Sequence, residues 1–598
     1  MHSRTRYSVF LAAAMVVALP LTPLAAQEAD DWVARSNANS ALLMEVFARF
    51  APEAAGQFGV EGLDEEVTQL PLDLNEQANA MIEGVLVELR SRLAAETHAA
   101  VRQDLEILID AAEQQIEGTA ITDKYELPYF NLPQTVFQGI RALLDDQVAA
   151  ERRPAALVRL RRYAGLEEGY PPIAEQATAF VRAKLGHAEL QGPFKDDLAK
   201  DRSNRARFID GIQQLFDKYE IGGYEEAYAA LRSQLDAYDA FLESELAPRV
   251  REDFRLPAEL YAFNLKGVGI DMPVAELVSR AKVSFREIQN EMQAVAALVA
   301  AERGLPAGDY RDVIAELKKE QLVGEAILPH YQGRIKDLEK LIAEHDVVTL
   351  PDREMRIRLA SEAESAQVPA PNMRPPRLFG NTGEMGEFVL PLRIPGEDGE
   401  EVGFDDFTFE AASWTLTAHE GRPGHELQFA SIVEKGVSQA RVAFAFNSVN
   451  VEGWALYQEA EMKPYLPLEG QLIALQHRLL RAARAFLDPG LQLGMMDRDE
   501  AYRILEKDVV MSHPMAMQEV ERYTFWAPGQ ATAYFCGYTR LMELRTDAER
   551  LLGDAFDRKA YHDFILAQGL LPPELLRKAV MEDFIGPRVE RDEPAMKG

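Results

Sequence analysis

Apolar residues recur at three- and four-residue spacing through successive stretches between about residues 40 and 350, a pattern typical of amphipathic helices. Clear examples are 76–94 ("EQANAMIEGVLVELRSRLA") and 274–304 ("VAELVSRAKVSFREIQNEMQAVAALVAAERG"). Breaks fall at proline and glycine clusters such as "GYPP" at 169–172. Each such helix has one apolar face to bury, so the pattern predicts helices packed on helices in a mainly α fold.

The composition changes at 366–403, where prolines and glycines surround "EFVLPLRI" at 387–394, the best strand candidate in the chain. This predicts a small β ribbon near 386–396. The strand could instead be an exposed edge that holds an extended peptide by backbone pairing. The change also predicts a boundary between an N-terminal helical region, 27–365, and a second region, 366–598, as parts of one composite fold. Helical patterns resume beyond it.

The N-terminus has the pattern of a secretory signal peptide. Two arginines within residues 1–6 precede an apolar run, and Leu-Ala-Ala at 24–26 forms a small-residue cleavage site. An uncleaved anchor helix is the alternative, but Pro20 and Pro23 shorten the apolar helix below the roughly 20 residues that span a bilayer. We therefore expect removal of residues 1–26 and a periplasmic or secreted protein with no membrane attachment.

Charge and cysteine content narrow the function further. The chain has 64 Lys and Arg against 97 Asp and Glu, a formal net charge of −33, which repels a phosphate backbone and argues against nucleic acid as a partner. Cys536 is the only cysteine, so the chain has no intrachain disulfide and no lipid-acceptor cysteine near the cleavage site. It lies in apolar helical sequence, and we assign it no chemistry.

The motif "HEGRPGHELQ" at 419–428 places two histidines six residues apart. In the zincin motif His-Glu-x-x-His the ligands are four apart, on one helix face. Six residues leave two imidazoles about 120° apart around an ideal helix axis, too far round to share an ion. Pro423 and Gly424 offer a remedy, because proline disrupts the helix there and a widened turn could bring His425 round to His419. The alternative is a corner between two helices with capped or solvated histidines.

A third ligand candidate lies in "NSVNVEGWALYQEAEM" at 447–462. Glu452 stands among a valine, a glycine and a tryptophan, and a carboxylate buried in such company needs a cationic partner, which a zinc ion would provide. Glu459, two helical turns later, is the alternative ligand or an acceptor for an imidazole N–H.

"HEGRPGHELQ" followed by "VEGWALYQE" at 451–459 resembles the bacterial family known as domain of unknown function 885, which is grouped with the glutamate-zincin metallopeptidases. Further segments agree in order. They are "RLLRAARAFLDPGLQ" at 478–492, "RYTFWAPGQATAYFCGY" at 522–538 and "YHDFILAQGLLPPELL" at 561–576. The resemblance is detailed across 405–590 and diffuse before it.

This resemblance implies a large, clefted helical fold similar to thimet-oligopeptidase and carboxypeptidase-Taq-like enzymes. It implies His419, His425 and Glu452 as zinc ligands and Glu420 as the base. Two positions depart from the pattern: Glu426 stands where the family commonly has a second histidine, and Gln492 stands where it has a histidine after Asp-x-Gly-Leu.

Zinc with three protein ligands keeps a position for water and lowers its pKa toward about 7. Glu420 would accept the proton of the attacking water and pass it to the leaving nitrogen. The tetrahedral oxyanion needs a further donor, and Arg522, Tyr523, Gln530 and Tyr534 are candidates.

Each candidate donor also has a structural interpretation. Tyr523 and Tyr534 could be core aromatic residues with satisfied hydroxyls. Arg522 could pair with Glu519 one turn earlier instead of holding a substrate carboxylate. Gln530 could simply begin a helix.

The sequence therefore predicts an exported zinc metallopeptidase that hydrolyses peptides or small amides. The remaining histidines, including His477, His513 and His562, have no partner at ligand spacing, and no Gly-x-Ser-x-Gly elbow or phosphate-binding glycine loop appears. Two alternatives remain: a metal-retaining protein without catalysis, suggested by Glu426 and Gln492, and a helical peptide-binding protein without metal.

Overall fold

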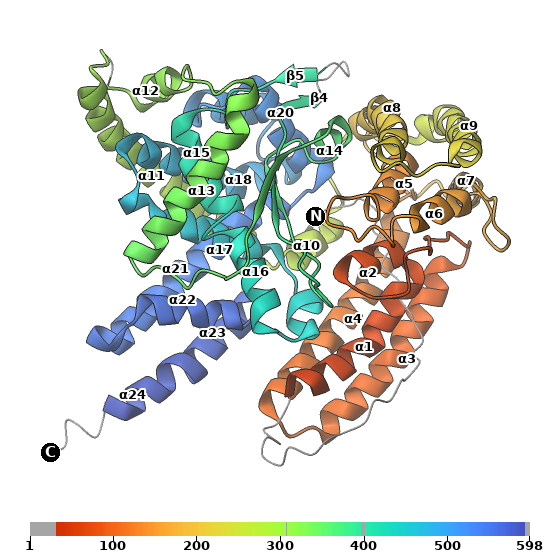
Figure 1. Cartoon of the computed structure of the whole chain (residues 1–598), viewed down its shortest axis with the longest axis horizontal. Helices are drawn as coiled ribbons and strands as arrows, with labels where there is room; N and C mark the ends of the chain where they lie inside the picture. The colour runs from red at the N-terminus through yellow and green to blue at the C-terminus, as the bar shows by residue number, and fades with distance from the viewer. Residues whose placement is uncertain (1–31, 307, 396–400, 593–598) are drawn as a thin grey trace. The chain divides into compact units, whose positions relative to one another are not determined.

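The computed structural model describes residues 32–306, 308–395 and 401–592 (Figure 1). The expected signal peptide, 1–26, lies outside the described residues. The chain forms two compact units. Unit 1 comprises the described residues up to Glu252 together with Arg377–Glu384 and Gly436–Ala445, and unit 2 comprises Asp253–Pro376, Met385–Lys435 and the described residues from Phe446 onward.

Unit 1 is helical, and its helices bury the apolar faces seen in the sequence. In α3, buried residues recur at 78, 82, 86 and 89, and in α4 at 101, 105, 108 and 112, so the two long helices pack along matching stripes. Its α-helices are α1 (Trp32–Phe50), α2 (Pro52–Phe58), α3 (Leu74–Ala95), α4 (Ala99–Tyr125), α5 (Leu132–Arg141), α6 (Ala155–Tyr163), α7 (Ile173–Lys184), α8 (Lys195–Lys218) and α9 (Glu225–Phe241).

Unit 2 is also mainly helical. Its α-helices are α10 (Ala258–Gly267), α11 (Val274–Arg303), α12 (Tyr310–Leu317), α13 (Ile327–Glu344), α14 (Glu362–Gln367), α15 (Glu410–Glu420), α16 (His425–Lys435), α17 (Ser448–Met462), α18 (Leu468–Gln492), α19 (Arg498–Arg503), α20 (His513–Glu521), α21 (Ala533–Leu552), α22 (Arg558–Ala567), α23 (Pro573–Ala579) and α24 (Gly586–Asp592). The prediction of a mainly α fold is confirmed.

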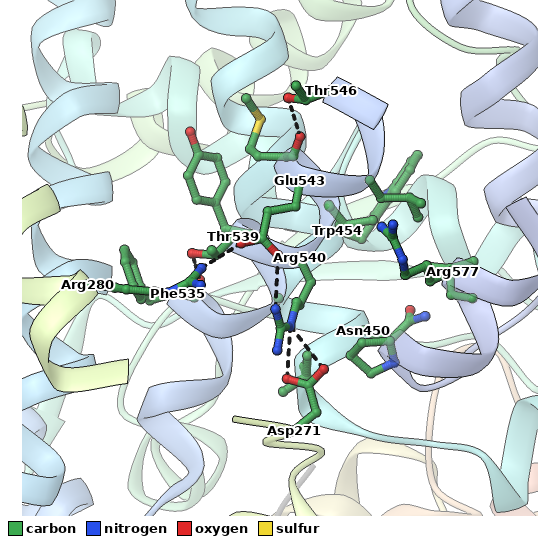
Figure 2. Close-up of a pocket in the computed structure, with 18 of the residues that line it drawn as sticks. Asp271, Arg280, Asn450, Trp454, Phe535, Thr539, Arg540, Glu543, Thr546 and Arg577 are labelled. Atoms are coloured by element: carbon green, nitrogen blue, oxygen red, sulfur yellow. Dashed lines mark hydrogen bonds and ion pairs between the residues drawn. The ribbon is translucent and has the colours of Figure 1, made fainter. Parts of the chain in front are cut away.

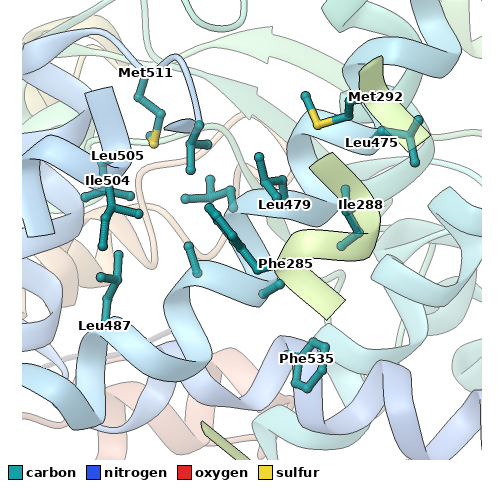
Figure 3. Packing of buried hydrophobic residues seen from close by; sticks show 14 of the residues in the cluster. Phe285, Ile288, Met292, Leu475, Leu479, Leu487, Ile504, Leu505, Met511 and Phe535 are labelled. Carbon is teal, nitrogen blue, oxygen red and sulfur yellow. The ribbon is translucent and has the colours of Figure 1, made fainter. Parts of the chain in front are cut away.

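The core of unit 2 forms where α11 packs along α18. Figure 3 shows Phe285 and Ile288 of α11 in the same buried cluster as Leu479 of α18. The ring of Phe285 meets that of Phe486 edge-on, with centroids 5.4 Å apart. Unit 2 begins at Asp253 because α11 packs against α18. The change in composition had instead predicted a boundary at 366. The helices after residue 253 complete the core of the C-terminal helices.

A small sheet interrupts the helices of unit 2. Its strand order is β1-β3-β2, with β1 (Arg356–Leu359) parallel and β2 (Asn372–Arg374) antiparallel to β3 (Glu387–Leu390). β4 (Arg393–Pro395) and β5 (Glu401–Gly403) form a separate antiparallel pair. The β structure predicted near 386–396 is present, but as two strands, β3 and β4, that belong to separate sheets.

For β3 the hypothesis of an exposed edge is wrong, because β3 is paired on both sides and all four of its residues are buried. Phe388 packs in a buried cluster with Tyr331 of α13 and Leu416 of α15. The central strand therefore serves as a support for α15 rather than as a free backbone edge.

Within the described part of the chain, no helix is both long enough and apolar enough to cross a membrane.

Candidate metal centre

His419 and His425 lie at the facing ends of two helices. Helix α15 ends at Glu420, Gly421 leaves the helical conformation with φ −100° and ψ −118°, and α16 begins at His425. The Arg422–Pro423 peptide bond within the turn is cis. The predicted widened turn of one continuous helix is therefore wrong, and residues 421–424 form a corner between two helices.

The corner nevertheless brings the two imidazoles together. Their ring centroids are 4.7 Å apart at an interplanar angle of 80°. Gly424 makes this possible, because a Cβ atom there would lie 2.0 Å from the carbonyl oxygen of His419 and 2.4 Å from that of Ala418. Only a residue without a side chain lets the turn fold back against the end of α15.

Arg422 holds the corner from inside unit 2. Its buried guanidinium donates to Glu426 at 2.7 Å, to Glu339 of α13 at 2.7 Å and to the carbonyl of Arg353 at 2.6 Å. Glu426 is itself fully buried and closely approached by Gly386. The residue that replaces a common family histidine is thus the counterion of Arg422.

Glu452 reaches the histidines because α17 crosses α21 at a pair of glycines. A Cβ on Gly453 would lie 2.6 Å from the Cα of Gly537, and one on Gly537 would lie 2.0 Å from the carbonyl oxygen of Val449. In addition, the indole N–H of Trp454 donates to the carbonyl of Pro423 at 3.1 Å, which ties α17 to the corner.

The three predicted ligands converge. One ligand atom from each of His419, His425 and Glu452 lies within 4.8 Å of the other two. Oε2 of Glu452 is 3.2 Å from Nε2 of His425 and 3.6 Å from Nε2 of His419. Two imidazole nitrogens and one carboxylate oxygen are a donor set that suits zinc with one open position. The residues present therefore fit the predicted metal.

Glu459 contacts His419 on the opposite side of its ring. Its Oε1 is 2.7 Å from Nδ1 of His419, and its other oxygen accepts a short hydrogen bond from the Thr415 hydroxyl. Burial raises the pKa of Glu459, but Arg481 and the bond from His419 outweigh this effect and hold the pKa at about 2. An ionised Glu459 accepts the Nδ1 hydrogen and leaves Nε2 free toward Glu452. Of the two roles predicted for Glu459, this geometry favours the acceptor.

Glu420 adjoins the cluster without being part of it. Its Oε1 is 4.0 Å from Nε2 of His419, and the side chain is almost completely buried. Burial raises the pKa of Glu420 to about 7, although the nearby His425 opposes this effect. A carboxyl group with this pKa can both accept and release a proton near neutral pH.

Three of the four predicted donors lie beside the cluster. Gln530, in η8 (Gln530–Thr532), donates to Oε1 of Glu452 at 3.4 Å, and its side-chain oxygen accepts a short hydrogen bond from Arg522. Arg522, in η7 (Arg522–Trp526), also donates to the Tyr534 hydroxyl at 3.0 Å. The ring of Tyr534 stacks near that of His419, with centroids 6.1 Å apart.

Tyr523 is not brought to the cluster. Its side chain is completely buried, and its hydroxyl donates to Glu519 at 2.6 Å. Glu519 is also held by Arg484 through two bonds of 2.8 and 2.5 Å. This geometry supports the core interpretation of Tyr523 and not the catalytic one.

A match to a known protein family shows which proteins this chain is related to. Residues 52–580 match the family described as bacterial protein of unknown function (DUF885). The chain belongs to the DUF885 family. No match was found among curated proteins.

Two solved structures share the fold of this DUF885 chain. A protein described as a lipoprotein from Colwellia psychrerythraea aligns with a TM-score of 0.72 at 18% identity, covering 92% of this chain and 98% of its own. A lipoprotein of unknown function from Shewanella oneidensis aligns with a TM-score of 0.66 at 18% identity, covering 92% and 100%. A PZ peptidase A with an inhibitor aligns over 85% of this chain and 95% of its own at 13% identity, but its TM-score of 0.26 supports no conclusion.

The second departure from the usual DUF885 pattern, Gln492, has a structural role. Its side-chain amide donates to the carbonyl of Tyr523 at 2.7 Å, and its oxygen accepts from the backbone N–H of Leu256 at 2.9 Å. Gln492 therefore braces η7 and the chain before α10.

Sequence reasoning missed two arginines of α18. Arg481 lies 3.4 Å from Glu459, and the guanidinium of Arg484 lies over the Tyr534 ring at 4.5 Å. Their signal was present in "RLLRAARAFLD", where three arginines recur at every third residue of a largely apolar helix. Buried arginines at such spacing indicate buried carboxylate partners.

The histidines predicted to be structural occupy different surroundings. His562 is fully buried between the Tyr457 hydroxyl at 2.8 Å and the carbonyl of Val347 at 2.7 Å. His513 is exposed and contacts Glu506 at 2.6 Å. Burial lowers the pKa of His477 to about 3, so it is neutral near Glu459.

A separate cavity of about 1070 Å³ is lined by residues of α11, α17 and α21, among others, and contains none of the predicted site residues (Figure 2). Several of the charged residues around it are paired with one another. Arg540 contacts Asp271 at 3.0 Å, and Arg280 contacts Glu543 at 2.6 Å. The cavity therefore offers no unneutralised charge at these pairs to attract an ionic ligand.

Proposed function

We propose that this DUF885 protein is an exported, zinc-dependent hydrolase of peptide or small amide bonds. The observation that carries the proposal is the convergence of His419, His425 and Glu452, with Glu420 4.0 Å from the nearer imidazole. Two imidazoles and a carboxylate bind the ion, and a second carboxylate that is not a ligand is available for proton transfer.

Zinc in such a site acts as a Lewis acid that activates water and polarises a carbonyl group. Glu459 would keep the Nδ1 hydrogen of His419 in place, so that Nε2 carries the lone pair for the metal. Glu420 would take a proton from the attacking water, whose oxygen bonds to the amide carbon. It would deliver that proton to the leaving nitrogen as the carbon–nitrogen bond breaks.

Tyr534 and Gln530 would stabilise the charge that develops on the substrate oxygen. Both lie next to metal ligands, since Tyr534 stacks near His419 and Gln530 contacts Glu452. Fixed donors in a buried site act without the reorganisation that water would require.

The departures from the family pattern do not favour the inactive alternative. Glu426 is bound to Arg422, and Gln492 is bound to backbone groups of Tyr523 and Leu256. Neither replacement removes one of the three proposed ligands or Glu420.

The test combines metal analysis with activity. We expect elemental analysis of the purified protein to find one zinc per chain, and a mixed peptide library to be cleaved by the zinc-loaded protein but not after chelation. Zinc without cleavage would identify a metal-retaining protein that is not a hydrolase. A folded protein that binds no zinc would overturn the proposal.

Export rests on the N-terminal sequence. We propose that residues 1–26 are removed on secretion, because arginines precede an apolar run that ends in Leu-Ala-Ala. Intact-mass analysis of the periplasmic fraction tests this, and a mature chain that still begins at Met1 would contradict it.

A further inference from the structure

We infer that Arg522 is the binding site for the free C-terminal carboxylate of a peptide substrate, so that the protein hydrolyses peptides from their C-terminal end. This inference rests on the proposed function and adds the class of substrate to it.

Arg522 is a largely buried cation whose ion pair with Glu519, the pairing considered from the sequence, is long. The nearest carboxylate oxygen, on Glu519, is 3.9 Å from its guanidinium. Glu519 already binds Arg484 through two bonds and accepts the Tyr523 hydroxyl, so it is neutralised by other residues.

The remaining contacts of Arg522 are with neutral groups, namely the side-chain oxygen of Gln530 and the hydroxyl of Tyr534. Its Nε has no hydrogen-bond partner within the part of the chain that is described. Its side chain retains 13% exposure. A buried arginine in this state is stabilised most by an anion that accepts hydrogen bonds from its planar guanidinium group. A carboxylate can accept two such bonds at once, one with each oxygen.

The position of Arg522 suits the end of a peptide. A single amide side chain, that of Gln530, bridges Arg522 and the proposed ligand Glu452. This bridge is one amide group with a hydrogen bond at each end, which is about as long as one to two residues of extended peptide at about 3.5 Å each. A terminal carboxylate bound at Arg522 would therefore bring a bond close to the C-terminus to the metal centre.

The charges of the cluster favour an anionic substrate. Arg481, Arg484 and Arg522 are grouped with three carboxylates, Glu452, Glu459 and Glu519. A divalent ion makes this cluster positive, even when Glu420 is ionised. The whole chain has a formal net charge of −33, so this cluster would be positive within a negatively charged protein. Such a local positive charge attracts an anionic group.

The test uses two matched mixtures of N-acetylated tripeptides, one with free C-terminal carboxylates and one with C-terminal amides. We expect the zinc-loaded full chain to release C-terminal amino acids from the acids with kcat/KM at least about 100-fold above that for the amides. Arg522→Met should abolish this preference, mainly by raising KM for the acids. Arg522→Lys should restore only part of it, because lysine lacks the planar fork.

Binding supplies a readout that does not need turnover. With Glu420→Gln, the acid mixture should raise the Tm and the amide mixture should not, and the added change Arg522→Met should remove the shift. Arg478→Met is the matched control, because Arg478 lies on α18, is similarly buried and pairs with Glu291. The control should keep the preference for acids.

Three results would overturn the inference. Equal cleavage or binding of acids and amides would leave the hydrolase proposal standing but remove the carboxylate site. Equal losses for both mixtures in Arg522→Met, in a variant that remains folded and keeps zinc, would make Arg522 a general donor. Cleavage mainly at internal bonds would assign the protein to the endopeptidases.

Discussion

Nδ1 of His419 lies 2.7 Å from Oε1 of Glu459, and both side chains are only 2% exposed. This bond joins α15 to α17 in the buried interior of unit 2. It sets which imidazole nitrogen can face Glu452 and His425, and the first prediction follows from it.

Glu459→Gln should weaken zinc binding without removing a ligand. The amide cannot carry the charge that favours the Nδ1 hydrogen of His419, and loss of such a supporting carboxylate typically costs about 10- to 100-fold in metal affinity. Competition with a chelator of known affinity measures the zinc Kd. Glu461→Gln is the control, because Glu461 is on the same helix but pairs with Arg545. An unchanged Kd in Glu459→Gln would show that the bond does not support a metal.

Glu420→Gln should reduce turnover by about 10²- to 10⁴-fold, because glutamine keeps the shape of the side chain but cannot accept the proton. Zinc content and substrate affinity should stay near those of the wild type. If the variant loses its zinc, Glu420 is a ligand. If it keeps normal hydrolysis, the base is another residue.

Gly424→Ala should disrupt the corner between α15 and α16. The new Cβ would lie 2.0 Å from the His419 carbonyl oxygen, so the turn must open and separate the two imidazoles. We expect loss of most zinc binding and a lower Tm. Gly84→Ala is the control, because Gly84 is an exposed position of α3 with no atom within 4 Å of the new Cβ. The control should be neutral or stabilise the helix by about 0.5–1 kcal/mol. Normal zinc affinity in Gly424→Ala would contradict this account of the corner.

Mild acid should destabilise the protein through His562. Burial lowers the pKa of His562 from 6.5 to about 3, so its contribution to stability is complete above pH 6.5 and is lost as the pH falls toward 3. Between pH 6.5 and 5 this one residue should cost about 2 kcal/mol of unfolding free energy. His562→Gln should flatten the dependence of denaturant unfolding on pH in this window. An equally steep dependence in the variant would show that other groups carry it.

Part of the site was predictable because its signals are local. The two histidines and Glu420 form a recognisable motif, and Glu452 is a charged residue among apolar neighbours. Gly424, next to a proline, indicates a turn. The sequence did not show that the turn separates two helices, because a proline and a glycine are compatible with both a kink and a corner. The approach of Gly424 to the backbone of α15 settles that choice.

The division of roles between similar residues depended on which helices meet. Glu452 and Glu459 lie on one helix, yet one faces His425 and the other binds the far side of His419. Tyr523 and Tyr534 were equivalent candidates, but only Tyr534 lies beside His419. The roles of Arg481 and Arg484 become clear only from their partners, Glu459 and Glu519, which are distant from them in the sequence.

By itself, the sequence determined the mainly helical character of this protein, its family and the identities of the candidate ligands, because helical periodicity and the spacing of a short motif are properties of neighbouring residues. Only the tertiary structure decided that β3 is a central strand, that Tyr523 is part of the core and that Arg522 shares its counterion, Glu519, with Arg484. The reason is physical. The burial of a side chain and its hydrogen-bond partners depend on which distant segments pack together, as α17 and α21 do at Gly453 and Gly537. The local sequence pattern does not indicate which segments these are.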